Sequence, residues 1–202
     1  MAIGENACQV ARMPIFVDHD ARRQEIADLA CRLISEGGIE SVTFRKLAAA
    51  ANCSTTNITH YFPDRHQLLL GSFRASGERA KQRFSDAVEH PEAGLLACLE
   101  ALLPMTEQAR RDWYVNLAFW QVASFDPALG KEQRRILRYF RGHIATVLRR
   151  SGTLTPQQVG KRARWLLTTT IGIGVQALME EAGWSPARQR AMLVEQLRML
   201  EL

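Results

Sequence analysis

The sequence predicts an all-α protein of about nine helices. Apolar residues recur at helical spacing in nearly every segment, and no convincing run alternates apolar and polar residues between turns as a half-buried strand would. Helix start signals recur along the chain as Asp-Pro, Thr-Pro and Ser-Pro pairs, which suit a first helical turn. The 202 residues are 47% hydrophobic and 23% charged, which is the balance of a folded globular chain rather than a disordered one.

The first helix is expected over about Asp20–Glu36, after residues 1–17, which have no periodicity and are expected to form a disordered arm. Apolar residues fall on one face of this helix, and two consecutive glycines, at 37 and 38, supply its C-terminal stop. Thr43 then caps a short second helix that ends at Asn52. Asparagine tolerates the left-handed backbone that a tight turn needs.

Ser54 caps a third helix of only about seven residues, which Phe62 and Pro63 bring to an end. Two short helices joined by a three-residue turn make a helix-turn-helix candidate. Residues 18–65 would therefore form a helix-turn-helix DNA-binding domain, and residues 66–202 a larger helical domain, with the junction inside a long fourth helix and no linker between them. The remaining helices are expected near residues 64–88, 92–108, 110–125, 127–150, 156–181 and 186–200.

Several protein classes find no support in the sequence. The longest uncharged stretch, Trp165–Met179, is too short and too polar to span a bilayer, and residues 1–16 do not resemble a secretion signal, so no membrane is expected and the cytoplasm is the expected location. The four cysteines and five histidines show no metal spacing, and no catalytic or phosphate-binding motif is present. The expectation is a protein that is not an enzyme and has no catalytic residue, metal site or cofactor.

The third helix carries an unusual polar face. At 100° per residue, Thr56, Asn57 and His60 point away from the apolar side formed by Ile58 and Phe62. The side chains at 59 and 61 flank the polar face. Such groups hydrogen-bond base edges in the major groove, although each residue taken singly is better explained as a helix cap or solvated surface. The caps at 43 and 54 leave free N–H groups that suit phosphate.

Four motifs lie in a fixed order along this module: Thr43-Phe-Arg-Lys-Leu-Ala48, Ala51-Asn-Cys-Ser54, His60-Tyr-Phe-Pro-Asp-Arg65 and Leu68-Leu69. In this order they resemble the N-terminal domain of TetR-family transcriptional regulators, over about residues 20–75. The resemblance implies an all-helical homodimer with a helix-turn-helix in each subunit and a C-terminal domain that binds a ligand and dimerises. It also implies DNA-binding positions at Thr43, Arg45, Ser54, Thr55, Thr56, Asn57, Thr59, His60, Tyr61 and Arg65.

The chain departs from the family pattern at three positions. Asn52 replaces the usual turn glycine, Thr59 stands where the family often has an aromatic residue, and Arg65 stands where lysine is common. These departures leave DNA binding intact as an expectation but put the operator sequence in doubt.

The helix expected at 110–125 is apolar nearly all round, which is typical of a buried helix. Its tryptophans, Trp113 and Trp120, are either core residues or the aromatic wall of a ligand pocket in which Asn116 and Gln121 supply polar contacts. The segment Ala118-Phe-Trp120, followed by Asp126-Pro, is also similar to choline-responsive betaine-pathway repressors.

The chemistry of a ligand stays open at this point. A quaternary ammonium or a polyamine would suit the tryptophan faces, and Asp112 could add charge. The arginines at 134, 135, 138 and 141 would instead suit an anionic effector, or would simply form a solvated basic face.

Small residues of the helix at 156–181 would let a second helix approach closely. Together with the final helix they would form a two-fold four-helix interface, as the resemblance also implies, unless they pack within one subunit. Gln176 would be either an interface contact or a polar group of the pocket. The residues expected at the dimer interface are Thr169, Gly172, Gly174, Val194 and Leu197.

These observations lead to one functional hypothesis and two alternatives. The hypothesis is a repressor that binds a near-palindromic operator in double-stranded DNA as a homodimer and is released by a small-molecule effector. One alternative is an activator or a regulator that responds to no effector. The other is a helical small-molecule-binding protein or enzyme without operator recognition.

Overall fold

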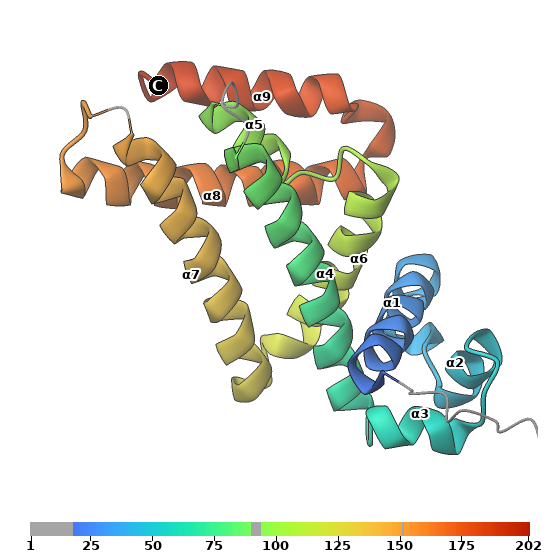
Figure 1. Ribbon diagram of the computed structural model, residues 1–202. Helices are drawn as coiled ribbons and strands as arrows, with labels where there is room; N and C mark the ends of the chain where they lie inside the picture. Colours follow the sequence, from blue (N-terminus) through green and yellow to red (C-terminus); the bar gives the residue numbers. More distant parts are fainter. Residues whose placement is uncertain (1–17, 90–93, 151) are drawn as a thin grey trace, which may run out of the picture.

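The computed structural model describes residues 18–89, 94–150 and 152–202 (Figure 1). Over these residues the chain forms nine α-helices and two short 3₁₀ helices and contains no strand, which confirms the predicted all-α class. The arm expected at 1–17 lies outside the described residues. The helices are α1 (His19–Gly37), α2 (Phe44–Ala50), α3 (Thr55–Tyr61), α4 (Arg65–Glu89), α5 (Leu95–Glu100), α6 (Glu107–Ala123), α7 (Pro127–Arg149), α8 (Pro156–Met179) and α9 (Pro186–Met199), with 3₁₀ helices η1 (Ile39–Ser41) and η2 (Glu181–Gly183).

Side-chain caps fix the helix starts where the sequence predicts them. Thr43 accepts a hydrogen bond from the backbone N–H of Lys46, and Ser54 accepts one from that of Asn57. Asp126, Thr155 and Ser185 cap α7, α8 and α9 in the same way. Asn52, between α2 and α3, has a φ of 49°, so the left-handed turn that the sequence predicts there is confirmed.

The helix predicted over 92–108 is wrong in extent. Helix α5 ends at Glu100, and turns lead from there to Thr106, which caps α6. Pro104 explains the break, because proline has no N–H to donate and its ring clashes with the preceding helical turn. The carbonyl of Leu102, freed by the break, accepts a hydrogen bond of 2.9 Å from the Trp113 indole.

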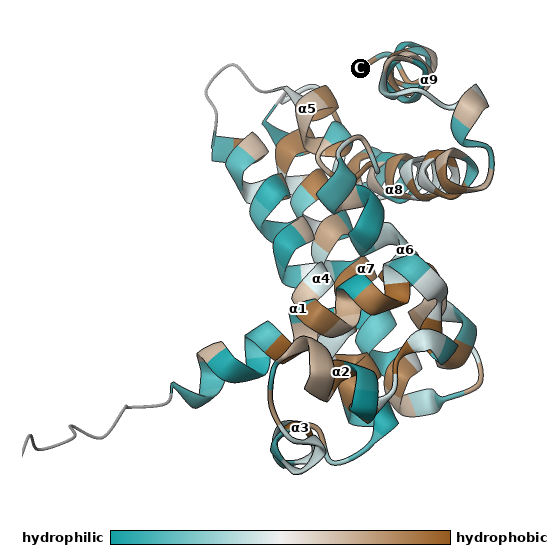
Figure 2. Cartoon of the chain, turned by 90° about the vertical axis from the view of Figure 1, so that its right-hand side faces the viewer, coloured by the Kyte–Doolittle hydropathy of each residue, from teal (hydrophilic) through white to brown (hydrophobic). Residues whose placement is uncertain are grey.

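The helices place two different surfaces at opposite ends of the molecule. Helices α1 to α3 gather at one end, α8 and α9 lie at the other, and α4 runs between them with α6 and α7 alongside (Figure 1). Figure 2 shows the same separation from the side, on helices that carry both hydrophilic and hydrophobic turns. With 25 residues, α4 is about 37 Å long, so one rigid element joins the two ends.

The core is continuous along this axis. Helix α1 packs against both α4 and α6, and buried residues from the first helices to the last belong to one apolar cluster. Phe73 of α4 stacks on Phe119 of α6 with ring centroids 3.7 Å apart. Helix α1 is therefore part of the same packed core as α4 and α6.

The described residues contain neither a membrane-spanning helix nor a cluster of metal-binding side chains. None of these helices combines the length and apolar character needed to cross a membrane. No group of three or more histidine, cysteine, aspartate or glutamate side chains is arranged to hold a metal ion in this part of the chain.

Candidate functional site

Helix α3 presents the polar face that its sequence predicts. Thr56, Asn57 and His60 are exposed, whereas Ile58 and Phe62 are completely buried and hold the helix against the module. Thr55, at the first helical position, is exposed as well. The short helix therefore offers hydroxyl, amide and imidazole groups to the outside while its apolar side is fixed in the core.

Two residues expected on the flanks of this face are less available than predicted. Thr59 is half-buried, and its hydroxyl donates to the carbonyl of Thr56 at 3.1 Å. The expectation that Tyr61 flanks the open face is wrong, because the residue is only 7% exposed. Its ring lies 5.2 Å from that of His60 and 5.9 Å from that of His19 on α1. A helical wheel does not show this packing, because it contains no information on the neighbouring helix.

The basic residues of the module differ in how free they are. Arg45 and Lys46 on α2 are exposed, and no acidic partner contacts them within the described residues. Arg65, expected to hold a phosphate, donates to the carbonyl of Ile39 at 2.8 Å and pairs with Glu40 at 2.8 Å. The charge of Arg45 is therefore not neutralised by any described acidic group, whereas Arg65 is held by η1 through Ile39 and Glu40.

Two arginines of α1 that the sequence analysis did not single out hold the helix-turn-helix in place. Arg22 donates to the carbonyl of Ala51 at 3.1 Å, and Arg23 donates to the carbonyl of Tyr61 at 2.5 Å. The guanidinium of Arg23 also lies 4.4 Å from the centre of the Phe62 ring. The last carbonyls of α2 and α3 lack partners within their own helices, so basic side chains on a neighbouring helix are suitable donors.

A cavity of about 70 Å³ lies among α4, α6, α7 and α8. Trp113, Asn116 and Trp120, which the sequence analysis assigned to a pocket, all lie in its wall. Trp113 is only 7% exposed and meets Trp120 edge to face, with ring centroids 5.9 Å apart. Trp113 is thus both a core residue and a wall residue. The rest of the wall is mainly apolar and includes Leu102, Ile136, Leu137, Phe140, Leu167 and Ile171.

Two polar residues assigned to the pocket lie elsewhere. Gln121 is exposed and lines a separate surface groove beside Val122 and Phe125, because it follows Trp120 and points about 100° away from it around α6. Gln176 is exposed on α8 and does not line the cavity. Instead Gln133 of α7, which the sequence analysis did not single out, contributes an amide to the wall.

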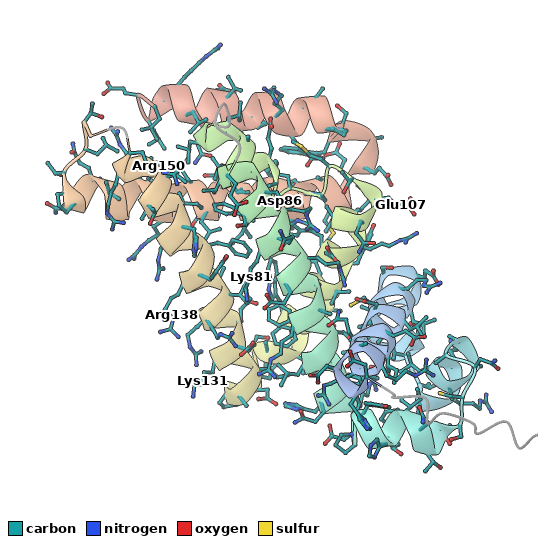
Figure 3. The ribbon with its side chains drawn as sticks, viewed as in Figure 1. Lys81, Asp86, Glu107, Lys131, Arg138 and Arg150 are labelled. Atoms are coloured by element: carbon teal, nitrogen blue, oxygen red, sulfur yellow. The ribbon has the colours of Figure 1, made fainter. Side chains whose placement is uncertain are left out.

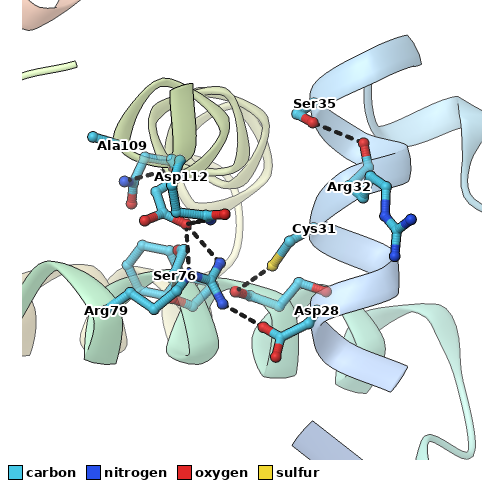
Figure 4. A network of polar contacts seen from close by, with 12 residues as sticks. Asp28, Cys31, Arg32, Ser35, Ser76, Arg79, Ala109 and Asp112 are labelled. Carbon is cyan, nitrogen blue, oxygen red and sulfur yellow. Dashed lines mark hydrogen bonds and ion pairs between the residues drawn. The ribbon is translucent and has the colours of Figure 1, made fainter. Parts of the chain in front are cut away.

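The Asp112 carboxylate is not free to meet a cation. It is 1% exposed and accepts a hydrogen bond from Arg79 at 2.6 Å (Figure 4). It also accepts one from Arg83 at 2.8 Å. Arg79 also pairs with Asp28 of α1. Burial disfavours the charged Arg79 guanidinium, but the hydrogen bond and charge of Asp112 outweigh it and raise the pKa of Arg79. The expectation that Asp112 adds negative charge for a ligand is therefore wrong.

The basic stretch of α7 faces away from the cavity. Arg134 and Arg138 are exposed, and Figure 3 shows Lys131 and Arg138 pointing outward from the helix. Arg135 pairs with Glu132 at 3.2 Å. Neither these arginines nor Arg141 lines the cavity, so the solvated basic face explains them better than an anionic effector in this cavity does.

The residues assigned to a dimer interface divide into two groups. Thr169 and Val194 are half-buried and Gly172 is exposed, so all three remain available to a partner. Leu197 is 9% exposed and packs in the core of the subunit. Gly174 is buried against Trp113, where a Cβ atom would lie 2.3 Å from the indole ring, so its assignment to the interface is wrong.

Large apolar side chains exposed on the last two helices were not assigned from the sequence. Trp165 on α8 is 52% exposed, and Met192 and Met199 on α9 are 37% and 72% exposed. The helical spacing of apolar residues in α8 and α9 includes these side chains. The spacing alone does not show which apolar face of each helix stays exposed in the folded subunit.

Comparisons with known proteins identify both parts of the chain. Residues 26–71 match the family model described as bacterial regulatory proteins, tetR family. Residues 91–200 match the model for the C-terminal part of BetI-type transcriptional repressors. The second match alone covers more than half of the chain.

Individual proteins agree with the family models. The chain is 31% identical over 110 residues to the HTH-type transcriptional regulator PksA of Bacillus subtilis, and the match covers 53% of the chain. It is 32% identical over 129 residues to the HTH-type transcriptional regulator BetI of Burkholderia mallei, and that match covers 60% of the chain. The matches span 54% and 65% of the length of these two relatives.

Solved structures show the same fold along nearly the whole chain. A transcriptional regulator from a Rhodococcus species superposes with a TM-score of 0.79 at 26% identity, covering 88% of this chain and 95% of that one. A regulator from Saccharomonospora viridis, crystallised in complex with choline, superposes with a TM-score of 0.73 at 24% identity, covering 89% and 96%. The helix-turn-helix module and the two family models that divide the chain between them lead to the same conclusion: this chain belongs to the tetR family of bacterial regulatory proteins.

Proposed function

We propose that this protein is a DNA-binding transcriptional regulator that reads a near-palindromic operator as a homodimer and leaves it when a small-molecule effector binds. The observation that carries the proposal is the exposed face of α3, where Thr56, Asn57 and His60 stand outward on a helix whose apolar side is fully buried. A short helix of this kind fits the major groove, and these side chains hydrogen-bond base edges there.

The contacts divide into those that position the protein and those that read sequence. The exposed N-termini of α2 and α3, at Thr43 and Ser54, and the free charge of Arg45 are suited to phosphates, which carry no sequence information. The amide of Asn57 and the imidazole of His60 are suited to bases. Residues 18–65 then act as the DNA-binding domain, and residues 66–202 as the domain for the effector and for dimerisation.

Dimerisation falls to α8 and α9 in this proposal. Their exposed side chains Trp165, Met192 and Met199, together with Gly172, form the kind of apolar surface that a single subunit leaves open for a partner. A two-fold axis along these helices presents two copies of α3 to the DNA, and half-sites about 34–36 Å apart then meet one helical turn of the duplex.

Effector binding is proposed for the cavity between α4, α6, α7 and α8. Arg83 and Asp112 lie in its wall, Arg79 binds the same Asp112 carboxylate, and Arg79 pairs with Asp28 of α1. A ligand that shifts α6 against α4 therefore changes contacts that fix α1, and α1 holds the ends of α2 and α3 through Arg22 and Arg23. The ligand acts to the extent that it binds the two arrangements with different affinity.

The match to the BetI-type repressor model favours repression over activation. No described group of side chains favours an enzyme, and the proposed place of action is the cytoplasm, where DNA is found in bacteria.

A gel-shift titration over several salt concentrations tests the DNA-binding part. Asn57→Ala and His60→Ala should lower the ratio of operator to random-duplex affinity by about ten-fold, because each removes a base contact worth roughly 1–3 kcal/mol. Arg45→Ala should weaken binding to both duplexes alike and reduce the slope of log affinity against log salt by about one. Equal behaviour of the two classes of variant would contradict the assignment of readers and anchors.

A further inference from the structure

Two residues that line the cavity each carry a buried polar atom that no described residue satisfies. Trp120 Nε1 and Gln133 Oε1 are both shielded from solvent and have no hydrogen-bond partner in the described part of the chain. Both residues line the same cavity, Trp120 from α6 and Gln133 from α7. A buried polar group without a partner costs about 1–3 kcal/mol, so a molecule that supplies both partners recovers this cost on binding.

The two atoms require different hydrogen-bonding groups on a ligand. An indole Nε1 can only donate, so it needs an acceptor on the ligand, whereas the Gln133 Oε1 needs a donor. A single hydroxyl group meets both needs, since it accepts through a lone pair and donates through its proton. The rest of the wall is mainly apolar, with the Trp113 ring and the side chains of Ile136 and Phe140. The Asn116 amide and the Thr170 hydroxyl, which also line the cavity, donate to backbone carbonyls of their own helices. The rest of the ligand is therefore expected to be apolar.

The charges in the cavity wall attract neither a cation nor an anion. Arg83 and Asp112 are the charged residues that line the cavity, and they are paired with each other at 2.8 Å. The network continues to Arg79 and Asp28, so its two arginines and two aspartates sum to zero. An ion entering the cavity loses its hydration and finds every countercharge already taken. Attraction of a cation to the tryptophan faces, about 0.5–2 kcal/mol, does not offset that loss.

The size of the cavity limits the ligand as well. At about 70 Å³ it is several times larger than one water molecule requires. It is also far smaller than the roughly 300–1,000 Å³ of pockets for drug-sized ligands. A compact molecule therefore fits and a large one does not.

We propose that this cavity binds a compact, uncharged ligand whose hydroxyl group accepts from Trp120 Nε1 and donates to Gln133 Oε1 and whose remainder is a branched apolar group. The inference rests on the proposed function in that it names the class of effector. It sets this chain apart from a regulator whose effector is a quaternary ammonium.

Two probes of nearly the same shape separate these classes. Choline and 3,3-dimethylbutan-1-ol share the two-carbon chain, the hydroxyl and the three methyl groups, and differ in having a charged nitrogen or a neutral carbon at the branch point. Isothermal titration calorimetry on the full chain should give an affinity at least ten times higher for the neutral alcohol. Equal or tighter binding of choline, or no binding of the alcohol at its solubility limit, overturns the proposal.

Variants test the two hydrogen bonds separately. Trp120→Phe and Gln133→Leu should each weaken binding of the alcohol by about ten-fold, because each removes one partner while keeping an apolar side chain of similar size. Gln121→Leu, which alters an exposed residue of α6 outside the cavity, is the matched control and should leave the affinity unchanged. Unchanged alcohol affinity in both cavity variants overturns the assignment of the two partners.

A variant that adds a charge to the cavity wall is expected to change the ligand preference rather than only weaken binding. Gln133→Glu puts an uncommitted carboxylate into the wall, so the preference should move toward choline by ten-fold or more. An unchanged preference overturns the electrostatic part of the argument. Operator binding is measured in parallel without any probe. If the protein prefers the alcohol but binds no operator, only the proposed function is contradicted. If it binds an operator but prefers choline, only this inference is contradicted.

Discussion

Replacing Asp112 by asparagine tests the role of the buried charge network most sharply. The side chain is 1% exposed, and its carboxylate pairs with two arginines that are each about a quarter exposed. Removing one partner of a buried ion pair costs about 3–5 kcal/mol. The cost is discounted here to about 2–3 kcal/mol, because both arginines reach some solvent and Arg79 keeps Asp28 as a partner.

This cost translates into a measurable loss of thermal stability. For a chain of this size, 1 kcal/mol lowers the midpoint of unfolding by about 2–4 °C, so Asp112→Asn should lower Tm by roughly 5–10 °C. Circular dichroism at fixed protein concentration measures the shift, since dimerisation makes Tm depend on concentration. Glu78→Gln is the control, because Glu78 is 66% exposed and, among the described residues, pairs only with Lys81, one turn away on the same helix. Its effect should stay within about 2 °C. An Asp112→Asn shift as small as that of the control would refute the view that this network holds α1, α4 and α6 together.

Three further predictions concern single positions. Gly174→Ala should destabilise the chain by about 1–3 kcal/mol because its Cβ meets the Trp113 ring at 2.3 Å. Gly160→Ala, at an exposed position of α8 with open space around it, should be neutral or stabilising, and equal urea midpoints of the two variants would contradict this packing. Burial raises the pKa of Cys31 from 9.0 to about 11, so the stability tied to this thiol is present below pH 9 and is lost as the pH rises toward 11. At pH 8.5, iodoacetamide should modify half-buried Cys53 well before Cys31, as peptide mapping would show. Hydrogen bonds from the backbone N–H groups of Leu129 and Ala128, with His66 nearby, lower the pKa of Asp126. The stability that this carboxylate contributes is therefore present above the ordinary carboxyl pKa of 3.8 and is lost as the pH falls below it. In urea titrations, Asp126→Asn should lose less stability than the parent between pH 6 and pH 3.

Local signals in the sequence predict most of the fold. Threonine, serine and aspartate caps followed by helical periodicity place the starts of α2, α3, α7, α8 and α9, since capping depends on residues only a few positions apart. The turn at Asn52 is predictable for the same reason. The break before Pro104 is predictable from the proline itself, so the helix expected at 92–108 is too long because its range does not take that signal into account.

The exposed face of α3 follows from the period of one helix, so Thr56, Asn57 and His60 are placed correctly as exposed residues. Contacts between distant segments do not follow from periodicity. The burial of Tyr61 depends on α1, and the commitment of Asp112 depends on arginines 29 and 33 positions away. Gln133 enters the cavity wall only through the packing of α7 against α4 and α6. Such features depend on tertiary packing, which a single sequence does not specify position by position.

Selection of bound fragments from random duplex DNA by the purified full chain, read out by sequencing, tests the central claim most directly. An inverted repeat should be enriched whose half-site centres lie about 10 base pairs apart or at a multiple of that spacing, and Asn57→Ala should lose this enrichment. Binding that falls with salt but enriches no sequence would contradict it, because phosphate contacts alone would then account for all of the affinity.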